Sequence, residues 1–178
     1  IVNGNQLFFT ANDNINGQEL WVSDGTTLGT HLVKDINPGA SSCIALNFKV
    51  WNNKLYFSAT NSNYSQLWVS DGTALGTQMV KLINPTNHSE PYFLTEYNSK
   101  LYFSANDGVN GYELWSTDGT TLGTTLVKDI YPGAAYGGSP RNFCVYNNLL
   151  YFSATTATNG EELYVTDGTA ANTQRVRD

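Results

Sequence analysis

Four aspartates in this sequence could do chemistry, because they recur at a regular spacing. Each begins an Asp-Gly-Thr triplet, and the four are Asp24, Asp71, Asp118 and Asp167. Grouped carboxylates can bind cations or act as acids. An aspartate before glycine also suits a tight turn, since its carboxylate caps backbone N–H groups while glycine adopts a positive φ. A catalytic residue is needed once, whereas a folding residue recurs in every repeat. We therefore predict that these aspartates are structural.

Two polar loops carry oxygen atoms of the kind that bind calcium. Their candidate ligands are Asp13, Asn16, Glu19, Asp107, Asn110 and Glu113. The spacing does not fit an EF-hand loop, and the matching loops of the other two repeats lack the aspartate. Calcium at these loops is one hypothesis, and polar hairpin loops without a metal are the alternative. No other cofactor is expected.

Aromatic residues offer two further possibilities. Trp21, Trp68 and Trp115, with Tyr164 in register, could stack on sugars. Because they recur at one position of the repeat, we predict that they pack between neighbouring sheets instead.

Residues that break the repeat are better candidates for binding a ligand. They are Tyr64, His88, Glu90, Tyr131, Tyr136 and Arg141. Aromatic side chains beside the flexible pair Gly137 and Gly138, with an arginine nearby, could form a shallow glycan or peptide site. Unselected variation in surface loops is the alternative.

The materials for catalysis are thin. His31 falls within an expected strand and His88 in a loop, and neither is accompanied by a serine or cysteine motif. Cys43 and Cys144 show no CxxC or histidine-paired spacing, so a zinc or redox site has little support. They are either two unpaired thiols or a disulfide. We expect that the chain is not an enzyme.

The elements that position these residues follow from an internal repeat. A Leu-aromatic-Phe-Thr/Ser-Ala segment begins at Leu7, Leu55, Leu101 and Leu150, in step with the Asp-Gly-Thr triplets. In the second repeat we expect strands at 46–51, 55–60, 66–70 and 77–83, with an Asn-Asn hairpin turn after the first. Neighbouring apolar residues along these strands predict sheets buried on both faces.

Four-stranded units of about 47 residues match the blades of a β-propeller. We predict an all-β, single-domain propeller with four blades, at approximately 1–39, 40–86, 87–133 and 134–178. A segment of a larger propeller, or an open stack of repeats, is the alternative. The chain opens with Ile1 in mid-strand and its one methionine is Met79, so we expect it to be part of a longer protein.

Composition narrows the possible partners. The net charge is −6, and no cluster of basic residues exists to contact phosphates, so a nucleic-acid partner is not expected. No stretch approaches the roughly 20 apolar residues of a membrane-spanning helix. Blade two has Lys81-Leu82 where the other blades carry a basic-acidic pair, and this uncharged edge could meet another subunit.

The motif Glu-Leu-Trp-x-x-Asp-Gly-Thr-x-x-Gly-Thr, followed by Val-Lys-Asp-Ile-x-Pro-Gly, resembles the ELWxxDGT repeat of large secreted or surface proteins of bacteria. Residues 19–39 and 113–133 match it nearly throughout. The second copy departs with Gln66, Leu82 and Thr86, and the fourth with Tyr164, Asn172 and Arg175. The resemblance implies secretion or a cell-surface location and an adhesive or architectural role. It implies no catalytic residue.

Two functions therefore remain open. The first is a structural or adhesive module that assembles with itself, for example into filaments, or with a surface partner. The second is a lectin-like, carbohydrate-binding propeller whose blade loops hold a sugar.

Overall fold

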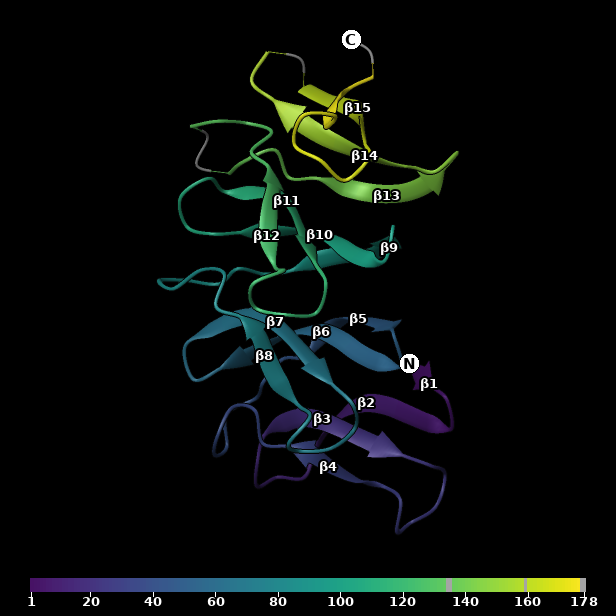
Figure 1. The fold of residues 1–178 in the computed structure, drawn as a ribbon. Coiled ribbons are helices and arrows are strands. Elements are labelled where there is room, and N and C mark those ends of the chain that lie inside the picture. Colours follow the sequence, from purple (N-terminus) through teal and green to yellow (C-terminus); the bar gives the residue numbers. More distant parts are fainter. Residues whose placement is uncertain (134–135, 159, 177–178) are drawn as a thin grey trace. The chain divides into compact units, whose positions relative to one another are not determined.

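The computed structural model describes residues 1–133, 136–158 and 160–176, and this part of the chain is all-β, without helices (Figure 1). Sixteen strands form four sheets of four strands each. The strands are β1 (Val2–Asn3), β2 (Gln6–Asn12), β3 (Gln18–Ser23), β4 (His31–Lys34), β5 (Leu46–Trp51), β6 (Lys54–Asn61), β7 (Tyr64–Ser70), β8 (Gln78–Lys81), β9 (Tyr92–Tyr97), β10 (Lys100–Asn106), β11 (Tyr112–Thr117), β12 (Thr125–Lys128), β13 (Arg141–Tyr146), β14 (Leu149–Thr156), β15 (Gly160–Thr166) and β16 (Gln174–Arg175).

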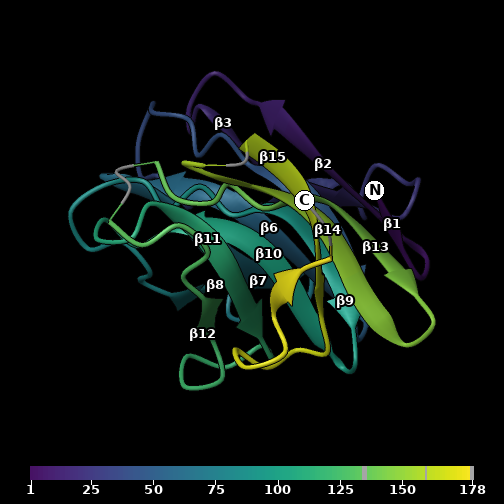
Figure 2. The same cartoon turned by 90° about the horizontal axis from the view of Figure 1, so that it is seen from above.

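Each sheet is an antiparallel meander in which strands adjacent in sequence are adjacent in space. Sheet β9-β10-β11-β12 is typical, and its four strands are labelled in the view from above in Figure 2. Such four-stranded meanders are the blades of propeller-type folds, so the predicted fold class is confirmed. We call the sheets blades one to four in chain order.

Short hairpin turns set the register of the blades. Asn52 and Asn53 both adopt a positive φ, at 49° and 56°, as the sequence predicted for this two-residue turn. Asparagine tolerates this left-handed conformation better than most residues. Asn147 and Asn148 repeat the turn in blade four.

The chain divides into two compact units of two blades each. Unit one comprises residues 1–82 and 86–88, and unit two comprises residues 83–85 and 89–178. Each unit has its own apolar core. In unit one, Phe8 and Leu20 of blade one form a single cluster with Leu55, Phe57 and Trp68 of blade two.

The core of unit two is richer in tyrosine. Leu114 of blade three and Phe152 of blade four belong to one buried cluster, together with Tyr97 and Tyr102. Tyr164, which stands where the other blades have tryptophan, stacks on Phe152 with ring centroids 5.7 Å apart. Aromatic pairs at this separation stabilise a core beyond the area that they bury.

Every Asp-Gly-Thr turn is closed by the same side-chain hydrogen bonds. In blade two, Asp71 Oδ1 accepts the N–H of Thr73 at 2.9 Å and its hydroxyl at 2.7 Å. Thr73 Oγ1 accepts the N–H of Gly76 at 2.9 Å, and the Thr77 hydroxyl donates to the Thr73 carbonyl at 2.7 Å. The other three turns repeat this set, with Asn172 replacing the glycine in blade four.

The carboxylates of these turns are therefore engaged in holding the backbone. The hydrogen bond from the threonine hydroxyl lowers the pKa of Asp71, and the same cause lowers the pKa of Asp24 and Asp118. At Asp167 the largest cause is the side-chain hydrogen bond from Asn172. A carboxylate held by such bonds stays ionised and positioned.

The glycine five residues after each aspartate is explained by close packing. A Cβ atom at Gly76 would overlap the carboxylate of Asp71, and Gly29 and Gly123 stand in the same relation to their aspartates. In blade four, Asn172 instead donates its side-chain amide to Asp167 Oδ2 at 2.6 Å. The departure of blade four from the motif is thus compensated by a new hydrogen bond.

Candidate functional site

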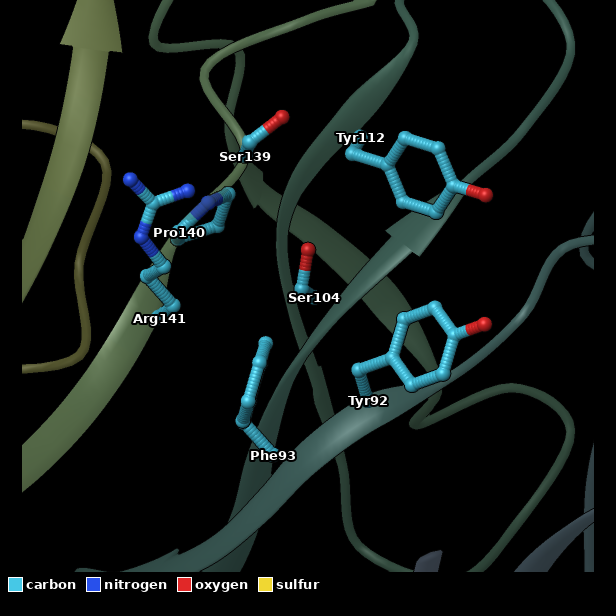
Figure 3. A pocket seen from close by; sticks show the side chains of 7 residues that line it. All are labelled: Tyr92, Phe93, Ser104, Tyr112, Ser139, Pro140 and Arg141. Atoms are coloured by element: carbon cyan, nitrogen blue, oxygen red, sulfur yellow. The ribbon is translucent and has the colours of Figure 1, made fainter. Parts of the chain in front are cut away.

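A pocket in unit two has a volume of about 220 Å³ and is lined mainly by aromatic and apolar side chains (Figure 3). Its lining residues are Tyr92, Phe93, Ser104, Tyr112, Ser139, Pro140 and Arg141. They come from the beginnings of β9, β11 and β13, from β10, and from the linker before β13. We call it the blade-three pocket.

This pocket forms where blade three departs from its sister blades. The first residue of the first strand pairs with a serine in three blades: Leu46 with Ser58, Tyr92 with Ser104, and Arg141 with Ser153. The next residue, at a bulge, has a positive φ each time. It is asparagine in blades two and four but Phe93 in blade three, with a φ of 62°.

Exchanging asparagine for phenylalanine changes the floor of the pocket. Asn47 donates its side-chain amide to Ser58 Oγ at 3.2 Å, and Asn142 donates to Ser153 Oγ at 3.1 Å. Phe93 has no amide to offer, and among the described residues no hydrogen bond reaches the Ser104 hydroxyl. The Phe93 side chain is half exposed at 49%. Ser104 and the exposed ring of Phe93 therefore line the same pocket.

Phe93 also carries a backbone cost. A left-handed conformation costs a residue other than glycine or asparagine roughly 1–2 kcal/mol. Strain of this kind marks functional positions when the surrounding structure maintains it. Here it places an aromatic ring at the wall of a pocket.

Two stacked tyrosines form the wall next to Phe93, across from Pro140 and Arg141 in Figure 3. The rings of Tyr92 and Tyr112 lie 6.4 Å apart at 29°. The Tyr112 hydroxyl donates to Glu90 Oε2. Burial raises the pKa of Tyr112, and the hydrogen bond with Glu90 raises it further, so the phenol remains neutral. In Figure 3 both tyrosine hydroxyls point away from Arg141, which leaves ring carbons toward the pocket.

The rim of the pocket is polar on one side only. Arg141 donates through Nε to Glu161 Oε1 at 3.0 Å, and its Nη2 pairs with Glu161 Oε2. This bidentate pair raises the pKa of Arg141 and lowers the pKa of Glu161. Because the guanidinium charge is already balanced, the pocket suits an apolar group better than an anion.

The predicted binding residues are therefore only partly brought together. Arg141 lines the pocket and Glu90 holds one of its tyrosines. Tyr131 donates its backbone N–H to Glu113 and does not line the pocket, and the side chain of Tyr136 is 82% exposed.

Tyr64 and His88 form a separate pair in unit one. Their rings meet edge to face with centroids 5.9 Å apart, and His88 Nδ1 accepts the backbone N–H of Ser65 at 2.9 Å. The pair fixes the linker after blade two against β7. The sequence grouped His88 with Glu90, but the two residues belong to different compact units.

In the predicted calcium loops, the aspartate side chains accept hydrogen bonds from backbone N–H groups of their own loop. Asp13 Oδ1 accepts the N–H groups of Ile15 and Asn16 at 2.9 and 2.8 Å. Asp107 Oδ1 accepts the matching N–H groups of Val109 and Asn110 at 2.8 and 2.7 Å. Within residues 1–133, 136–158 and 160–176, no three Asp, Glu, His or Cys side chains gather into a group that could hold a metal ion. Calcium binding stays a prediction.

The two loop glutamates are buried and hold the linkers. Glu113 is fully buried and accepts the backbone N–H groups of Ile130 at 2.7 Å, Tyr131 at 3.2 Å and Gly138 at 2.7 Å. Burial raises the pKa of Glu113 to about 7, since desolvation of the charge outweighs the three hydrogen bonds. We call this arrangement the Glu113 clamp.

Blades one and two also have a side chain that holds the following linker at the repeat position of Glu113. Glu19 accepts the N–H groups of Ile36 at 2.9 Å and Asn37 at 3.3 Å, and burial raises its pKa as well. In blade two the residue is Gln66, whose amide donates to the Asn87 carbonyl at 3.3 Å. A neutral amide fits there because this linker presents an acceptor.

Other chemically suggestive residues are not part of a site. Cys43 and Cys144 are free thiols rather than a disulfide, one buried and one exposed. A second, larger hollow of about 600 Å³ lies in unit two, and it is lined by Glu96, Tyr97, Asn98, Val145, Asn148 and Asp167. Asp167 there is the turn aspartate already described.

Comparisons with known proteins bear on the fold alone. The sequence matches no family model and no curated protein. Two solved structures of puromycin hydrolase, one of a mutant complexed with PGG, align with TM-scores of 0.59 and 0.58 at 14% identity. They cover 97% of this chain, which spans only 28% of theirs. An α-L-arabinofuranosidase of Clostridium thermocellum aligns with a TM-score of 0.41 at 17% identity, over 98% of this chain and 69% of its own.

Proposed function

We propose that this chain is a non-enzymatic repeat module of a secreted or surface protein, with an adhesive role in which it assembles with copies of itself or with a surface partner. The single observation that carries this proposal is the blade-three pocket. It is built largely at positions where one blade departs from its sisters, namely Tyr92, Phe93 and Tyr112. Because four similar blades build the fold, one blade can carry residues that differ from those of the others. The rest of the structure can then maintain the strained backbone of Phe93.

The chemistry of the pocket supports binding rather than turnover. Its lining offers rings, a proline, two serine hydroxyls and a guanidinium already paired with Glu161. Apolar pockets with a few fixed polar groups are typical of recognition sites. The resemblance to ELWxxDGT repeats supports the adhesive role and the location outside the cell.

Assembly is tested by sedimentation velocity over a wide concentration range, with electron micrographs of the concentrated protein. We expect a mass that rises with concentration, or capture by a surface partner, and a weaker effect in Tyr92→Ala. Tyr136→Ala is the matched control, because Tyr136 is 82% exposed and does not line the pocket. A chain that stays monomeric and captures no partner would contradict the proposal.

A lectin-like function is the second candidate, and the rim of the pocket favours it. The planar Arg141–Glu161 pair beside aromatic rings is an arrangement that can hydrogen-bond neighbouring hydroxyl groups while a sugar ring stacks. A glycan array read with and without a calcium chelator tests it. Saturable binding of one glycan class, lost in Tyr112→Ala, would support the lectin. Loss on chelation would locate that binding at a calcium-dependent loop instead.

A further inference from the structure

Three leucines are almost fully exposed at the same place in three blades. Leu28, Leu75 and Leu122 lie in the Asp-Gly-Thr turns, and their exposed fractions are 96%, 95% and 92%. Blade four has alanine at the matching position, Ala171. The core does not require a leucine at this position, because the side chain is not buried. Blade two nevertheless has the leucine, although it differs from the other blades at several other positions of the repeat. We call these side chains the leucine tips.

The turns that carry the leucine tips are rigid. Each turn is held by the hydrogen bonds of its aspartate and two threonines. In blade two these bonds span the segment from Asp71 to Thr77, and Leu75 lies within this segment of the sequence. A side chain presented by a fixed backbone loses less conformational freedom on binding than one on a mobile loop. The tips are uncharged and flanked by Thr, Ala and Gly, and the carboxylate of the turn aspartate nearby is already held by hydrogen bonds within the turn.

The blade-three pocket has the properties that such a tip requires. Its volume of about 220 Å³ admits a branched aliphatic side chain, and the rings of Phe93, Tyr92 and Tyr112 supply the apolar walls. The charge of Arg141 at its rim is paired with Glu161. Burial of a leucine among aromatic carbons is favourable without any polar complement.

The tip and the pocket of blade three lie at opposite ends of one strand. Tyr112 begins β11 and lines the pocket, whereas Thr117 ends β11 and leads into the turn of Leu122. The five steps from the first to the last residue of this six-residue strand separate the two ends by about 17 Å. The Leu122 tip therefore cannot fill the pocket of its own blade, so we consider a tip carried by another molecule.

Resting on the proposed self-assembly, we propose that a leucine tip of one copy inserts into the blade-three pocket of a second copy. Two different surfaces then meet, so the contact is heterologous and each added copy still offers a free tip and a free pocket. Such a contact grows head to tail. Burying one leucine strengthens association by about 10- to 100-fold, so a single contact is weak and repetition along a longer array would multiply it.

The test uses two complementary variants of the whole chain. The tip variant carries Leu28→Ser, Leu75→Ser and Leu122→Ser. The pocket variant carries Phe93→Asn and Tyr112→Gln, which gives blade three the residues that blade two has at position 47 and blade one at position 18. Ile15→Ser is the matched control, because Ile15 is 72% exposed but lies outside the Asp-Gly-Thr turns. Circular dichroism confirms that each variant is folded.

Sedimentation velocity of each variant and of an equimolar mixture decides the question. We expect each variant alone to associate at least 10-fold more weakly than the wild type, and the control to be unchanged. The mixture should form complexes that stop growing at four chains at most, since each pocket-variant chain keeps three tips and each tip-variant chain keeps one pocket.

Each other outcome overturns the inference in a recognisable way. If the wild type assembles and the tip variant assembles equally well, self-assembly stands but the leucine tips do not cause it. If the pocket variant alone is unimpaired, the tips bind elsewhere. If the wild type is monomeric and binds a glycan through Tyr112, both self-assembly and this contact fail while the lectin-like function stands.

Discussion

We expect the Glu113 clamp to make the stability of unit two depend on pH, and Glu113→Gln should remove that dependence. A carboxyl whose pKa is higher in the folded state than in the unfolded state contributes stability at low pH. That contribution is complete below the unfolded value of 4.5 and is lost as the pH rises through the folded value of about 7. The wild-type unit should therefore become less stable between pH 5 and pH 8.

The magnitude follows from the two pKa values. A tenfold change in proton affinity corresponds to about 1.4 kcal/mol, so a rise from 4.5 to about 7 corresponds to about 3 kcal/mol lost across this interval. Glutamine imitates the protonated acid in shape and charge. Its amide nitrogen cannot accept a backbone N–H as the carboxylate oxygen does, so Glu113→Gln should be somewhat less stable than the wild type near pH 4.5 but should keep the same stability up to pH 8.

Hydrogen exchange resolves the effect within unit two. The backbone amides of Ile130, Tyr131 and Gly138 bond to the clamp, so their protection, corrected for the intrinsic pH dependence of exchange, should fall with rising pH in the wild type but not in the variant. Urea unfolding at the same pH values gives the free energy. Gln66→Glu is the mirror variant, and it should introduce a loss of stability at high pH into unit one.

Equal pH dependence in the wild type and in Glu113→Gln would refute the reasoning. It would mean that the three hydrogen bonds offset the cost of burying the charge. In that case the variant would be less stable than the wild type by the same amount at every pH, because the cost of the glutamine amide that faces a backbone donor does not depend on pH.

Three further predictions concern the turns, the pocket and the thiols. Gly76→Ala should destabilise unit one by about 1–3 kcal/mol, because the added methyl group overlaps the Asp71 carboxylate. The midpoint of urea unfolding measures this loss, and Ala74→Gly is the control in the same turn. Equal midpoints for the two variants would count against the packing argument. Phe93→Asn should stabilise unit two by about 1–2 kcal/mol by relieving the left-handed strain and providing a partner for Ser104, and a lower midpoint would show that the ring contributes more than its strain costs. A thiol reagent should modify exposed Cys144 in the native chain but spare Cys43, whose pKa burial raises to about 12; two fast-reacting thiols by mass spectrometry would contradict this.

The repeat made the sheets predictable. The spacing of Asp-Gly-Thr and of the Leu-aromatic-Phe strands places four strands in each blade, and the predicted strands at 46–51 and 66–70 agree with β5 and β7 within two residues. Four independent copies of one pattern support one another, whereas a single copy would leave helix and strand harder to distinguish.

The pocket and the clamp were less accessible to sequence reasoning. Glu113 belongs to a cluster of oxygen-bearing residues, and only the packed linker shows that its carboxylate is buried. Phe93 left a signal that a strand-by-strand comparison could have found, since it stands where Asn47 and Asn142 recur. Its importance depends on the left-handed bulge, which a sequence pattern of period two does not reveal.

The Glu113 clamp has a mechanical consequence. A force that pulls on the chain after blade three acts first on β12, a short strand at the edge of the sheet. The hydrogen bonds between β12 and β11 would then break one after another. The clamp lies just beyond this strand and ties Ile130 and Gly138 to β11, an inner strand. A force on the linker is thereby transmitted to an inner strand of the sheet. Because Glu113 is expected to stabilise the unit more when it is protonated, the linker should resist this force better at low pH.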